Sequence, residues 1–138
     1  MLAVNYKNLL TKIYPEIPKI FNLETAVYLY NATVANVSVA TFFIPKGTNF
    51  VPSEYLIGIE VDDFNQIPIR QEKGFTITDP VRTLQDLFTY KEYVDYQVLF
   101  DYVSGFAIYH EQDPCGFLDE KTHREVKQIE EEGWSHGY

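Results

Sequence analysis

The stretch from residue 75 to residue 88, FTITDPVRTLQDLF, constrains the fold of this chain more than any other. Residues 75–78 alternate apolar and β-branched side chains, which is typical of a short strand. Asp79 then stands at a helix N-cap position and Pro80 at the first helical position, where its missing N–H would have no partner in any case. The apolar residues that follow recur at helical steps: Val81, Leu84, Leu87 and Phe88. The stretch therefore predicts a strand, a tight corner and a capped helix.

Arg82 and Asp86 stand four residues apart on another face of this predicted helix. Arginine before aspartate is the weaker order for such a pair, which contributes only a few tenths of a kcal/mol when exposed. We therefore expect Arg82 to reach a backbone carbonyl or another carboxylate and to tie the helix to the sheet. A contact with a partner protein is the alternative role for both residues.

Two segments of the chain resemble a known family. Residues 79–87 resemble the (S/T/D)-P-x-R-T-L-x-D-L signature in the C-terminal domain of AbiEi-family antitoxins, which belong to abortive-infection (type IV toxin–antitoxin) systems. The matching residues are Asp79, Pro80, Arg82, Thr83, Leu84, Asp86 and Leu87. Residues 23–33, LETAVYLYNAT, are similar to the family's S-H-x-T-A-L-Y-L-H-G-L segment, with Tyr30 at its second histidine and Asn31 at its glycine. The segments stand in family order and cover residues 22 to about 105.

The resemblance implies a non-enzymatic domain that binds and neutralises a nucleotidyltransferase-type toxin. It implies no cofactor and no catalytic or metal-binding residues. Antitoxins of this type begin with a winged helix-turn-helix, but only the 21 residues 1–21 precede Asn22, too few for that domain. DNA recognition is therefore not carried over to this chain. An interaction domain without a toxin, acting in phage defence or regulation, is the alternative within the binding class.

The composition fits one globular domain, residues 1–138, with its core at about 20–110. The chain is 46% hydrophobic and 16% aromatic, and its net charge is −9. This charge argues against non-specific nucleic-acid binding by this chain alone and against anionic membranes, and it suits a basic protein partner. The abundance of tyrosine and phenylalanine favours a core and sheet surface rich in these residues, and an aromatic patch that binds a partner is the alternative.

Further strands are expected at residues 37–44, 55–61 and 66–70, in addition to 75–78. Pro68 makes the third of them an edge strand, and Gly58 marks a bulge or a close backbone approach. Helices are expected within residues 1–14, from an Asn22 cap to about Tyr30, and after the signature stretch. The pattern predicts an α+β fold with a small mixed or antiparallel sheet of about four strands and helices packed on it.

An acidic helix is expected at residues 119–132, capped by Asp119. Val126 and Ile129 give it only a thin apolar stripe, and Trp134 follows it. The pattern slightly favours a helix that packs on the domain with its charges facing water. The alternative hypothesis is that this helix, with Trp134 behind it, docks on a basic partner or on a second copy of the chain. The candidate partner-binding residues are Arg82, Asp86, Val126, Ile129 and Trp134.

A magnesium-dependent nuclease is the alternative from another class. Such enzymes hold the metal with an acidic residue and a strand carrying (D/E)-x-K. Asp62 or Asp63 followed by residues 71–73, Gln-Glu-Lys, matches this pattern loosely. Matches of three residues arise often by chance, so we expect two solvated turns of a hairpin instead. Other candidates for metal or nucleophilic chemistry have neither ligand spacing nor a catalytic motif: His110, His123, His136 and Cys115.

The sequence predicts a cytoplasmic protein. Its single cysteine, Cys115, excludes an intrachain disulfide. No apolar run approaches the ~20 residues that a membrane span needs. The first ten residues, MLAVNYKNLL, lack the apolar region and cleavage site of a signal peptide.

Overall fold

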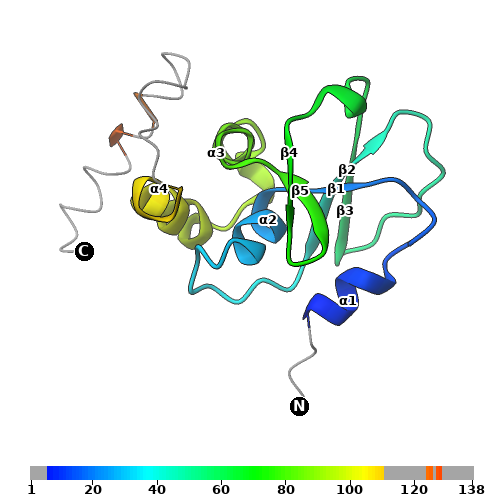
Figure 1. Cartoon of the computed structure of the whole chain (residues 1–138), viewed down its shortest axis with the longest axis horizontal. Helices are drawn as coiled ribbons and strands as arrows, with labels where there is room; N and C mark the ends of the chain where they lie inside the picture. The colour runs from blue at the N-terminus through cyan, green and yellow to red at the C-terminus, as the bar shows by residue number, and fades with distance from the viewer. Residues whose placement is uncertain (1–5, 111–123, 126, 129–138) are drawn as a thin grey trace.

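The computed structural model describes residues 6–110, 124, 125, 127 and 128 and has an α+β fold (Figure 1). The helices are α1 (Tyr6–Lys12), α2 (Leu23–Leu29), α3 (Pro80–Thr89) and α4 (Tyr96–His110), with short 3₁₀ turns η1 (Phe64–Gln66) and η2 (Lys91–Tyr93). The strands are β1 (Ile20–Phe21), β2 (Ala40–Pro45), β3 (Leu56–Val61), β4 (Ile69–Glu72) and β5 (Phe75–Thr78). The predicted fold class is confirmed.

The strands form one mixed sheet in the order β3-β2-β1-β5-β4. The β2–β3 and β1–β5 pairs are parallel, whereas β1–β2 and β4–β5 are antiparallel. The sheet has five strands rather than the four that the sequence predicted. The missed strand is β1, which has two residues and therefore shows no alternation that a pattern could reveal.

Strand β1 lies at the centre of the sheet despite its length. Phe21 pairs with Phe42 of β2 on one side and with Ile77 of β5 on the other. Both β1 residues are buried, so the sheet surrounds them with apolar side chains. The short strand thus joins the β2–β3 pair to the β4–β5 hairpin.

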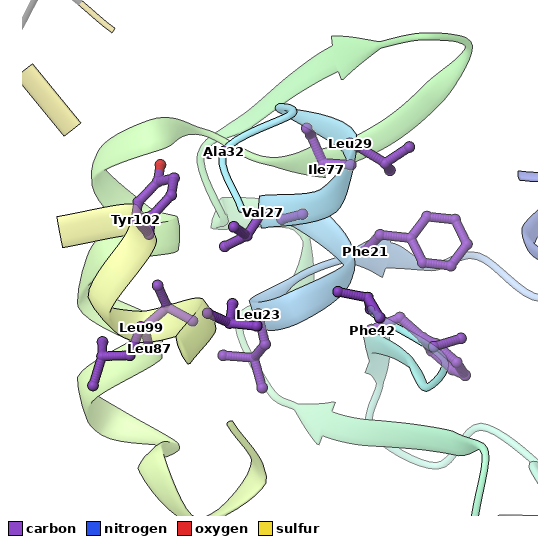
Figure 2. Packing of buried hydrophobic residues seen from close by; sticks show 14 of the residues in the cluster. Phe21, Leu23, Val27, Leu29, Ala32, Phe42, Ile77, Leu87, Leu99 and Tyr102 are labelled. Carbon is purple, nitrogen blue, oxygen red and sulfur yellow. The ribbon is translucent and has the colours of Figure 1, made fainter. Parts of the chain in front are cut away.

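Helix α2 lies between the sheet and the pair α3 and α4 (Figures 1 and 2). Leu23 and Val27 lie on the side of α2 toward Leu87 of α3 and Tyr102 of α4 in Figure 2. The side chains of this central layer are fully buried: Leu23, Ala26, Val27 and Leu29. The helix is therefore buried nearly all round, which differs from the one-sided helix of a small domain surface.

Several element boundaries differ from those predicted. Strand β2 begins at Ala40 rather than at residue 37, and β4 runs over Ile69–Glu72 rather than 66–70. The carbonyl of Pro68, which precedes β4, accepts a hydrogen bond from the N–H of Asp79 at 3.1 Å. Strand β4 lies at one edge of the sheet, as expected. Lys73 and Gly74 form the two-residue turn into β5, with φ angles of 53° and 86°. Positive φ angles at both positions give the turn a twist that matches the right-handed twist of the two strands.

Gly58 is a point of close approach rather than a bulge. The ladder between β2 and β3 runs without interruption from Ala40↔Leu56 to Pro45↔Val61. A Cβ atom at Gly58 would lie 2.9 Å from Cε1 of Phe50 and 3.1 Å from Cε2 of Phe42. Only glycine lets these two rings rest on the strand.

The predicted corner at Asp79 is confirmed. Asp79 Oδ1 accepts a hydrogen bond from the N–H of Arg82 at 2.8 Å, and Pro80 is the first helical residue of α3. Leu84, Leu87 and Phe88 are buried, while Val81 is half-buried at the margin of the apolar face. The N-terminus of α2 differs, because Asn22 makes no side-chain cap and its buried amide has no hydrogen-bond partner among the described residues.

Replacing Asp79 with alanine should lower the free energy of unfolding by about 0.5–2 kcal/mol, since the first turn of α3 loses its side-chain acceptor. Chemical denaturation measures this change. Asp62→Ala is the matched control, because the side chain of Asp62 is 82% exposed and pairs with Lys46, whose side chain is 74% exposed. A control that loses as much stability as Asp79→Ala would contradict the capping role.

Candidate functional site

The two segments that resemble the antitoxin family meet in space at the corner between β5 and α3. The hydroxyl of Tyr30, at the end of α2, donates to the carbonyl of Thr78 at 2.8 Å. Tyr102 of α4 donates to the carbonyl of Pro80 at 2.9 Å. Thr83 also donates to the Thr78 carbonyl at 3.1 Å, and the two threonine hydroxyls lie 2.6 Å apart. Side chains from the end of α2, from α3 and from α4 thus bind the carbonyls of Thr78 and Pro80, while the carbonyl of Asp79 accepts the N–H of Thr83.

Asn31 stands where the family has glycine, and its backbone explains that preference. Its φ of 59° is left-handed, the conformation that glycine adopts most easily and asparagine tolerates. Asn31 donates its N–H to the carbonyl of Tyr28 at 2.9 Å, and Ala32 donates to Val27 at 3.0 Å. These two bonds form the Schellman motif that ends a helix. The position therefore serves the fold.

Arg82 and Asp86 form an ion pair on α3. Arg82 Nε lies 2.9 Å from Asp86 Oδ1, and the side chains are 21% and 5% exposed. The guanidinium carbon of Arg82 also lies 5.3 Å from the centre of the Phe43 ring on β2. Arg82 thus ties α3 to the sheet, as expected, but through an aromatic ring and its own helix partner rather than through a carbonyl.

Burial raises the pKa of Asp86 to about 6, and Arg82 offsets only part of this effect. Nearby Asp63 and Asp79 add to the rise through their negative charges. Asp86 Oδ2 has no hydrogen-bond partner among the described residues, which is unfavourable for a buried carboxylate. Perturbed carboxyl groups of this kind occur both at functional sites and in structural ion pairs. The contacts of Asp86 match the structural case.

The residues of the nuclease alternative do not meet. Asp62 and Asp63 line a surface hollow of about 290 Å³ beside η1, next to the start of β4. Glu72 and Lys73 lie at the other end of β4, and a four-residue strand spans roughly 13 Å at ~3.3 Å per residue. Across the described ranges, no group of three or more His, Cys, Asp or Glu side chains could hold a metal ion.

A second candidate site is the surface at η2 and the start of α4, formed by Glu92, Tyr93, Asp95 and Tyr96 and named here the acidic aromatic corner. All four residues are exposed, and Tyr93 and Tyr96 are exposed by 45% and 54%. Tyr96 stacks on Phe100 with ring centres 6.3 Å apart, which holds its ring in place. The corner thus presents aromatic rings beside carboxylates.

Part of the expected acidic helix lies beside this corner. Lys91 Nζ is 2.8 Å from Glu125 Oε2, and residues 124, 125, 127 and 128 are helical. The Lys91 side chain is 51% exposed, so this pair contributes little to stability. Three of the predicted partner-binding residues lie outside the described residues: Val126, Ile129 and Trp134.

Sequence reasoning missed the aromatic residues around both sites. Phe43 alternates with Phe42 along β2 and therefore faces the smaller apolar cluster, where Tyr90 packs on it at 6.0 Å. The predicted partner-binding residues included neither Tyr93 nor Tyr96. Three tyrosines spaced three residues apart between charged residues, 90, 93 and 96, were the available signal.

Comparison with protein-family models found no match, and comparison with curated proteins found no significant match. The antitoxin resemblance therefore rests on the two segments alone. Among the helices that the structure describes, none combines the length and the apolar character needed to cross a membrane.

The raised pKa of Asp86 predicts a pH dependence of stability. The folded chain holds this proton more tightly than the unfolded chain, whose carboxyl has the ordinary pKa of 3.8. The resulting stabilisation is fully present below that value and is lost as the pH rises through about 6.

Asp86→Asn removes the titration while it keeps the shape of the side chain. When the pH is lowered from about 7.5 to about 5, the unfolding free energy of the wild type should rise by about 1 kcal/mol relative to that of this variant. Urea denaturation at both pH values measures the difference. Parallel pH profiles for the two proteins would show that Asp86 is ionised as readily in the folded chain as in the unfolded one.

Proposed function

We propose that this chain is a non-enzymatic, cytoplasmic binding domain that neutralises a nucleotidyltransferase-type toxin, and that it needs no cofactor. The resemblance to AbiEi-family antitoxins supports the class of partner. Tyr30 of one family-like segment and Thr83 of the other both donate to the carbonyl of Thr78, just before the second segment, as expected if the segments define one domain.

The acidic aromatic corner is the observation that carries the proposal. Tyrosine side chains supply large, rigid contact area and are enriched among the residues that dominate binding energy. Carboxylates beside them favour a basic partner and speed its association. The chain has a net charge of −9, so its long-range field acts in the same direction.

The family-like residues themselves are poor candidates for direct contact. The side chain of Asp86 is 5% exposed, and that of Arg82 is 21% exposed and covers Phe43. A standard interface buries ~800 Å² on each partner, which exceeds what the four residues of the corner offer. We therefore place the interface on the corner and on the neighbouring helix that contains Glu125.

The proposal predicts a nucleotidyltransferase gene beside the gene for this chain, and co-expression of the two proteins tests it. Expression of that enzyme alone should arrest growth, and this chain should restore it. The double substitution Tyr93→Ala and Tyr96→Ala should weaken binding at least tenfold by calorimetry, since it removes two central aromatic contacts. Tyr55→Ala is the matched control, because Tyr55 is 57% exposed but lies beside α1.

If the double variant and the Tyr55→Ala control lost the same binding affinity, the acidic aromatic corner would not be the interface. A gene neighbourhood without a nucleotidyltransferase, or growth that this chain does not restore, would contradict the toxin. The chain would then be an interaction domain with another partner.

A further inference from the structure

Strand β3 is one edge of the sheet, and its backbone groups alternate between β2 and the outside. The N–H of Ala40 donates to Tyr55 at 2.9 Å, and the N–H of Lys46 donates to Val61 at 3.1 Å. Odd-numbered residues of β3 therefore face β2. The even-numbered residues, Leu56, Gly58 and Glu60, direct their N–H and C=O groups outward.

The outer edge is open over residues 57–61. Leu56 exchanges hydrogen bonds with Ser53 at 3.3 and 3.5 Å, which closes the edge at the start of the strand. Within the described part of the chain, no backbone group is bound to the outward groups of Gly58 and Glu60. Every residue of β3 is partly or fully exposed, whereas β2 beside it is buried up to its last residue.

The opposite edge of the sheet is protected and β3 is not. Pro68 precedes β4, and the exposed Arg70 and the half-buried Glu72 place charges on a strand of only four residues. Charges, proline and short length are the usual devices that prevent edge strands from pairing. Strand β3 is six residues long and carries a single charge, Glu60, whose carboxylate accepts the N–H of Gly47 at 2.8 Å.

We propose that β3 pairs antiparallel with β3 of a second copy of this chain, about a two-fold axis at Ile59. In this register Gly58 faces Glu60 of the second copy, and their backbones exchange two hydrogen bonds. Glu60 of the first copy pairs in the same way with Gly58 of the second copy. The open stretch 57–61 then matches the length of the strand that fills it. The Ser53–Leu56 bridge begins where the second strand leaves the edge at Val61.

The side chains of β3 suit a second copy because the strand complements its own reversed sequence. Ile59 meets Ile59, and Ile57 meets Val61, so apolar side chains pair on one face. On the other face each Glu60 lies opposite Gly58, which has no side chain, and no two like charges stand directly opposite. The pairing joins two five-stranded sheets into one and leaves the acidic aromatic corner outside the interface.

Glu60→Pro tests this pairing, because the N–H that proline lacks points outward and makes no bond within the sheet. Glu60→Ala is the matched control, since it loses the same carboxylate but keeps the N–H. Sedimentation of the full chain should give twice the 16.1 kDa mass of one chain for the wild type and the alanine variant. The proline variant should sediment as a monomer.

Hydrogen exchange gives a second readout that needs no variant. The amides of Gly58 and Glu60 should become at least tenfold more protected as wild-type protein is concentrated through the dimer range. A wild type that stays monomeric at about 100 μM would overturn the proposal, as would a dimeric Glu60→Pro. Protection of these two amides that does not change with concentration would overturn it as well, even if the proline variant failed to fold.

Discussion

The structure depends on the hydrogen bonding of the corner between β5 and α3. Thr78, the last residue of β5, is fully buried, and an unpaired backbone carbonyl there would be unfavourable. Here Tyr30 donates to Thr78 and Tyr102 donates to Pro80. Since these tyrosines come from α2 and α4, satisfying one corner fixes the position of two other helices.

This constraint explains why the family-like residues serve the fold more than they serve a binding site. Asn31 ends α2 in the left-handed conformation, which directs the chain away after Tyr30. Arg82 spans from Asp86 to the ring of Phe43 and holds α3 against the sheet. The two surfaces proposed for recognition lie away from the corner between β5 and α3. They are the acidic aromatic corner at η2 and α4, and the outer edge of β3.

Much of the fold follows from local sequence signals. The Asp79-Pro80 corner, the strand at residues 75–78 and the helix that follows each depend on neighbours within a few residues. Strand β1 could not be predicted, because two residues carry no periodicity and its pairing with β2 and β5 is a tertiary property. The parallel pairing of β2 with β3 is tertiary for the same reason.

The candidate sites were less predictable than the fold. Arg82 and Asp86 were identified from their spacing, but the burial of Asp86 and the contact with Phe43 depend on how α3 lies on the sheet. The exposure of Tyr93 and Tyr96 depends on where α4 begins. A proline such as Pro68 can mark an edge strand because it lacks an N–H, but no local signal shows that β3 is the other edge, since strand order is set by the whole sheet.

The central claim is that the tyrosine hydroxyls at the corner hold the two family-like segments together. Tyr30→Phe removes one hydroxyl and keeps the ring. The histidine that the antitoxin family has at this position also carries a hydrogen-bond donor on its ring. Tyr28→Phe is the control on the same helix, since the Tyr28 ring packs edge-on against Tyr6 with centres 4.7 Å apart.

The deciding measurement is the free energy of unfolding of these two variants by chemical denaturation. Tyr30→Phe should lose about 1 kcal/mol or more, because the buried Thr78 carbonyl loses a donor, while Tyr28→Phe should stay within about 0.5 kcal/mol of the wild type. A Tyr30→Phe protein as stable as the wild type would contradict the account.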